Sequence, residues 1–201
     1  METYILLMLT AFGAYTLKSK DQNRRIALLG SYLGQHQVEK LMESLTEGYL
    51  RALGESDPDR QAQVWNLLTT SETVLCEQFN RFVTDFSKVE EADARVSKFA
   101  IAIPYADKLF PSATFDLREA LRIHAQGITN AANSGLNQTP KSKAFTMSAE
   151  LFLMQHTCNW FCRSKTVASA RMMARHKTSY DQLLASVSPT TRNVYCALMG
   201  R

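Results

Sequence analysis

Cysteine is scarce in this sequence, and the motifs of the common enzyme classes are missing. The 201 residues include four cysteines, which are too few for the disulfide framework that small secreted domains need. We therefore expect free thiols in a reducing compartment. There is no glycine-rich phosphate loop, no G-x-S-x-G elbow, no H-E-x-x-H pair and no dinucleotide fingerprint. These gaps favour a protein with neither catalytic chemistry nor a cofactor, although distant helices can still assemble catalytic groups.

Strict alternation of apolar and polar residues is also missing, which argues against β-strands. Apolar residues instead recur at helical spacing, in segments near 38–53, 58–88, 90–102, 114–134, 147–161, 180–187 and 189–199. Proline and glycine separate many of these segments. The sequence predicts an all-α fold, an irregular bundle of about six to eight helices that begins with an apolar helix.

The first seventeen residues contain no charge between Thr3 and Leu17. A helix that is apolar on every side needs lipid or protein around it, and cations at one end suit the cytoplasmic side of a bilayer. We expect a membrane-anchor helix formed by Tyr4, Ile5, Leu6, Leu7, Met8, Leu9, Phe12, Tyr15 and Leu17, followed by the juxtamembrane cations Lys18, Lys20, Arg24 and Arg25.

This reading divides the chain into an anchor at 1–17, a basic juxtamembrane segment at 18–34 and a helical bundle at 35–201. The polar stretch at 135–143 is the candidate hinge within the bundle. The expected topology is a single pass with the N-terminus outside and the body in the cytoplasm.

An alternative follows from the length of the apolar run, which is shorter than the ~17–25 residues of an ordinary span. The same helix could lie in the core of the bundle or at an interface between subunits. The protein would then be a soluble cytoplasmic ligand-binding or sensor module, with a small molecule held between helices.

The C-terminal part of the chain is poor in acidic residues. Residues 139–201 contain nine Lys and Arg against two Asp and Glu. Within this part, a run without acids supplies candidate contacts to an anionic partner, such as nucleic acid or anionic lipid: Arg163, Lys165, Arg171, Arg175 and Lys177. Helical geometry spreads them over several faces, so a solvated surface is the favoured interpretation and nucleic acid the weakest.

Two cysteines are weak candidates for a metal or thiol site. Cys158 and Cys162 are four residues apart and can share one helix face, whereas His156 lies ~200° around the helix from Cys158. Buried free cysteine is common in protein cores, so the sequence favours a structural role and no bound metal. His124, on an apolar stripe, is likewise expected in the core.

These observations favour a membrane-anchored cytoplasmic protein that acts by binding other proteins, as a scaffold or accessory subunit. The identity of the partner proteins and the oligomeric state do not follow from the residues.

Overall fold

The computed structural model describes residues 2–133 and 138–200, and about four fifths of the chain is helical. This part contains ten α-helices, eight of them with seven or more residues, and two short strands. The order is α1 (Glu2–Leu33), α2 (Val38–Gly54), α3 (Pro58–Phe86), α4 (Glu91–Ala94), β1 (Arg95–Ser97), α5 (Ala106–Leu109), a 3-10 turn (Pro111–Ala113), β2 (Thr114–Asp116), α6 (Leu117–Asn133), α7 (Pro140–Cys162), α8 (Lys165–His176), α9 (Tyr180–Ser186) and α10 (Pro189–Met199). The predicted all-α bundle is confirmed.

Capping residues begin several of the helices where the sequence predicts a start. The Asp57 carboxylate accepts hydrogen bonds from the backbone N–H groups of Asp59 and Arg60, and Pro58 occupies the first turn of α3. Ser188 accepts from the N–H of Thr191 at the start of α10. Such caps satisfy donors that have no partner within the helix.

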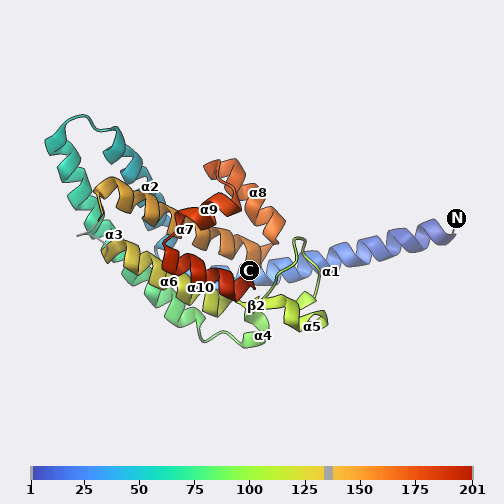
Figure 1. The fold of residues 1–201 in the computed structure, drawn as a ribbon. Coiled ribbons are helices and arrows are strands. Elements are labelled where there is room, and N and C mark those ends of the chain that lie inside the picture. Colours follow the sequence, from blue (N-terminus) through green and yellow to red (C-terminus); the bar gives the residue numbers. More distant parts are fainter. Residues whose placement is uncertain (1, 134–137, 201) are drawn as a thin grey trace.

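The core lies around α6 and α7, which pack along each other near the middle of the molecule (Figure 1). On one side α3 covers α6 and α2 covers α3, while α8 and α9 pack on α7. Phe82 and Phe86 of α3 are fully buried, with Leu121 of α6 and Phe161 of α7. Each fully buried apolar side chain of this size contributes ~1.5–3 kcal/mol, so this cluster is a main source of stability.

A small strand pair replaces the helix that the sequence predicts at 90–102. After the single turn of α4, β1 pairs antiparallel with β2, so that Val96 lies opposite Phe115. The indole of Trp160 in α7 donates to the Ser97 carbonyl at 2.9 Å. Each strand has three residues, too few for alternation to be visible in the sequence.

The first two predicted segments form one continuous helix, α1, whose N-terminal half projects from the body (Figure 1). The hinge candidate at 135–143 lies partly outside the described residues, which omit 134–137. Its last four residues, 140–143, form the first turn of α7. That turn is capped by Thr139, whose hydroxyl accepts from the Ser142 N–H at 3.2 Å.

The expected transmembrane helix requires correction. None of the helices within residues 2–133 and 138–200 is long and apolar enough to cross a membrane. The uncharged run of fifteen residues at 3–17 spans about 22 Å at ~1.5 Å per residue, against a hydrocarbon thickness of ~30 Å.

Candidate functional site

The most exposed apolar feature is residues 3–17 of α1, which we call the arm. All nine of the side chains predicted to form the anchor are exposed, from 46% for Leu17 to 75% for Tyr4 and Met8. They surround the helix on every side, so the arm has no polar face. The alternative interpretation allowed these residues to lie in the core of the bundle. Their exposure shows that they do not.

The junction between arm and body is held by side chains that the sequence assigned to a basic flank. The Arg25 guanidinium is buried, donates to the Arg95 carbonyl at 2.7 Å and pairs with Asp21 at 3.1 Å and Asp107 at 3.6 Å. Arg24 pairs with Asp93 at 2.6 Å. Both arginines therefore fix α1 to the body, while Lys18 and Lys20 are exposed at the base of the arm.

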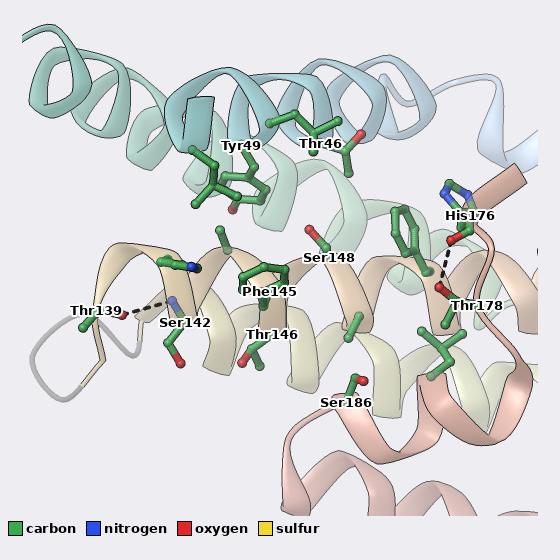
Figure 2. Close-up of a pocket in the computed structure, with 17 residues that line it drawn as sticks. Thr46, Tyr49, Thr139, Ser142, Phe145, Thr146, Ser148, His176, Thr178 and Ser186 are labelled. Atoms are coloured by element: carbon green, nitrogen blue, oxygen red, sulfur yellow. Dashed lines mark hydrogen bonds between the residues drawn. The ribbon is translucent and has the colours of Figure 1, made fainter. Parts of the chain in front are cut away.

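A groove of about 890 Å³ lies between α2 and α7 and extends to α8 and α9 (Figure 2). Its apolar lining includes Leu50 and Leu53 of α2, and Phe145 and Phe152 of α7. Hydroxyl groups interrupt the lining, among them those of Thr46, Ser148, Thr178 and Ser186. A concave surface that is largely apolar, with a few polar groups, is typical of binding sites between helices.

The two ends of the groove differ. At one end the Arg175 guanidinium of α8 lies 3.8 Å from the Glu43 carboxylate of α2, and the His176 ring stacks on Phe152 with ring centroids 3.8 Å apart. Burial, together with the charge of Arg175, lowers the pKa of His176 below its usual value. At the other end lies Thr139 of the α7 cap.

Beside Tyr49, which lines the groove, a buried polar cluster connects α2, α3 and α7. The Tyr49 hydroxyl donates to the Glu72 carboxylate at 2.6 Å, and the Lys143 ammonium lies 2.5 Å from the other carboxylate oxygen. Burial and the neighbouring Glu72 carboxylate raise the pKa of Tyr49 far above its usual value. This cluster fixes the spacing of the two groove walls.

The basic residues predicted to contact an anionic partner lie on α8 and at its two ends. Arg163 donates to the Gln22 side chain at 2.9 Å, and the Lys165 ammonium lies 4.9 Å from the centroid of the Tyr180 ring. Arg171 donates to Asn159 at 2.7 Å, Arg175 pairs with Glu43 as described above, and Lys177 adopts a left-handed conformation that ends α8. Several of these cations therefore contact their own chain.

Cys158 and Cys162 lie on α7, partly buried and free of disulfides. Burial raises the pKa of the Cys158 thiol far above its usual value and that of Cys162 to about 11. Within the described residues no group of three or more His, Cys, Asp or Glu is placed to hold a metal ion. A raised thiol pKa also opposes the thiolate form that metals bind.

The histidines considered in the sequence lie in the core. His124 Nε2 is 2.9 Å from the Thr157 hydroxyl, which in turn is 2.9 Å from the Tyr195 hydroxyl. His156 Nε2 is 3.0 Å from the Ser169 hydroxyl. These side chains form buried hydrogen-bonded contacts between α6, α7, α8 and α10.

Comparisons with protein-family models, with curated proteins and with solved structures found no match. The sequence analysis identified the arm but missed the groove. Leu50 is an exposed apolar residue on an amphipathic helix, and Phe145 lies outside the helical segment predicted at 147–161. Only the distance between α2 and α7 makes them walls of one groove.

Proposed function

We propose that this protein attaches to a membrane through its arm and that its helical body binds other proteins from the cytoplasmic side. The exposure of the arm around its whole circumference carries this proposal. A helix that is apolar on every side matches the uniform surroundings of hydrocarbon.

The residues next to the arm support insertion from one side of the bilayer. An apolar length of about 22 Å reaches past the middle of a hydrocarbon layer ~30 Å thick. Lys18 and Lys20 are exposed where lipid headgroups would lie, and Tyr15 sits one turn away from Lys18, at a depth where aromatic residues are enriched.

Apolar side chains beside the base of the arm add a second contact in this proposal. Ile101 and Leu109 are more than 60% exposed, and Phe110 is also exposed. They lie on α5 and its flanking segments, which Asp107 ties to Arg25 of α1. The four free cysteines fit a body in a reducing compartment.

The groove between α2 and α7 supports the second part of the proposal, that the body has a binding function. In the alternative function, a soluble ligand-binding module, the small molecule would bind in the same groove. Nucleic-acid binding has weaker support, because several of the basic residues on and beside α8 contact their own chain.

Flotation with phospholipid vesicles tests attachment. We expect the full chain to float with vesicles, and a double variant with Leu6→Asp and Leu9→Asp to remain unbound. A charge deep in hydrocarbon costs about 3 kcal/mol, which is on the order of a 100-fold loss of partitioning for each substitution.

Leu67→Asp is the matched control, since Leu67 is 71% exposed on α3, outside the arm, and this variant should still float. Replacing Lys18 and Lys20 with Gln should weaken binding most for vesicles that contain anionic lipid. Equal flotation of the full chain and the Leu6→Asp/Leu9→Asp variant would contradict the proposal.

A further inference from the structure

Away from a membrane, the arm leaves a large apolar surface in water. Its nine exposed side chains amount to on the order of 1,000 Å² of apolar area, whereas the largest patch on a typical monomer is ~300–600 Å². The groove between α2 and α7 is a second apolar surface that nothing in the chain covers in the described residues. We propose that, without lipid, the arm of one copy docks in the groove of a second copy.

The lengths of the two surfaces match. On α7 the lining runs from Thr139 to Phe152, about 20 Å at ~1.5 Å per residue, and the arm is about 22 Å long. Both walls present side chains at the i, i+4, i+7 spacing against which a third helix can pack: Thr46, Leu50 and Leu53 on α2, and Phe145, Ala149 and Phe152 on α7. Binding of an apolar helix in such a groove is a common mode of protein recognition.

Charged side chains lie at both ends of the groove. The Arg175–Glu43 pair and His176 narrow one end of the groove. At the opposite end, next to Thr139, Lys141 belongs to the lining.

The arm cannot reach the groove of its own chain. It is continuous with the rest of α1, which Gln22 and Arg25 fasten to the body through Arg163 and Arg95. It points away from α2 and α7 (Figure 1). Docking therefore requires a second molecule, either by reciprocal exchange in a closed dimer or head to tail in a longer assembly.

The proposal shares the arm with membrane attachment but depends on the groove, so the two can fail separately. Lipid and groove compete for the same arm, and the docked form would be a lipid-free state of the protein. Variants of the groove should therefore still float with vesicles, at least as well as the original chain.

Light scattering after size-exclusion chromatography, in buffer without lipid or detergent, tests the docking. The original chain should associate as its concentration rises. Leu6→Asp with Leu9→Asp should give monomers by removing the apolar arm. Leu50→Asp with Phe145→Asp should also give monomers, because both side chains are exposed and a charge there disturbs the groove and not the core.

Complementation separates arm-to-groove docking from pairing of two arms. The groove variant keeps its arm and the arm variant keeps its groove, so an equimolar mixture should form a heterodimer although each variant alone is monomeric. Leu67→Asp matches Leu50→Asp in exposure, 71% against 72%, and should associate normally. A groove variant that still associates, a mixture that stays monomeric, an original chain that is monomeric, or loss of association in Leu67→Asp would overturn the proposal.

Discussion

The two buried histidines make a prediction about acid stability that follows directly from their surroundings. His124 and His156 are fully buried. The His156 ring stacks on the Tyr180 ring, with ring centroids 4.6 Å apart. Burial, with a contribution from His156, lowers the pKa of His124 to about 3. Burial, with a contribution from Lys165, lowers the pKa of His156 to about 4. Both rings are therefore neutral in the folded protein at any pH above these values.

In the unfolded chain each histidine takes up a proton near pH ~6.5. Because the pKa values of both histidines are depressed in the folded protein, the stability that their neutral rings contribute is fully present above about pH 6.5. This contribution is lost as the pH falls towards about 4 and then about 3. At about pH 5 each histidine should reduce the free energy of unfolding by about 2 kcal/mol relative to neutral pH. Two such losses are large against a total of ~5–15 kcal/mol.

Urea unfolding between about pH 8 and about pH 5 measures the effect. Below about pH 6 the wild-type free energy of unfolding should fall with a slope that approaches about 1.4 kcal/mol per pH unit for each histidine, and His156→Gln should remove one of the two contributions. Burial raises the pKa of Glu150, which acts with the opposite sign, but Glu150 is common to both chains and cancels in the comparison. Parallel pH dependences for wild type and both single variants, His124→Gln and His156→Gln, would refute the reasoning.

Three further predictions concern packing and reactivity. Lys143→Met should lower the free energy of unfolding by ~3–5 kcal/mol, because it leaves the buried Glu72 carboxylate without its cation; replacing Glu72 with Met as well should recover much of this loss in urea unfolding. Gly127→Ala should destabilise the fold by ~1–3 kcal/mol, since a Cβ there would lie 2.4 Å from a Glu150 oxygen. Gly30→Ala should be neutral or stabilising by up to ~1 kcal/mol, because a Cβ there meets nothing within 4 Å. Equal changes in the melting temperatures of the two variants would contradict this difference. Cys162 should alkylate on the order of 100-fold more slowly than a free thiol near pH 8, because burial raises its pKa to about 11, and mass spectrometry of a timed iodoacetamide reaction measures the rate.

Helical periodicity made most of the bundle predictable. The segments at 38–53 and 58–88 agree closely with α2 and α3 because each has a regular apolar stripe and, at 57–58, an Asp-Pro start. The strand pair was missed because its pairing depends on contacts with residues distant in sequence, such as the Trp160 bond to Ser97. Long-range contacts of this kind leave no local pattern.

Some functional features were likewise predictable from the local sequence, and others depend on distant contacts. The arm was predictable, since the absence of charge from Thr3 to Leu17 is a local property. The roles of the four basic residues after it were not, because Arg25 is buried only where α5 and β1 surround it. The groove was also invisible, since its walls come from segments about one hundred residues apart.

By itself the sequence determined that the chain forms helices, where most of them begin and end, and that one helix has an uncharged, apolar first half. These properties depend on neighbours within a few turns, where backbone bonding and side-chain spacing act. The tertiary structure decided that the arm projects into solvent, that two histidines are buried and that α2 and α7 leave a groove between them. Such properties depend on which distant surfaces meet, and the free energy of burial is set only when they do.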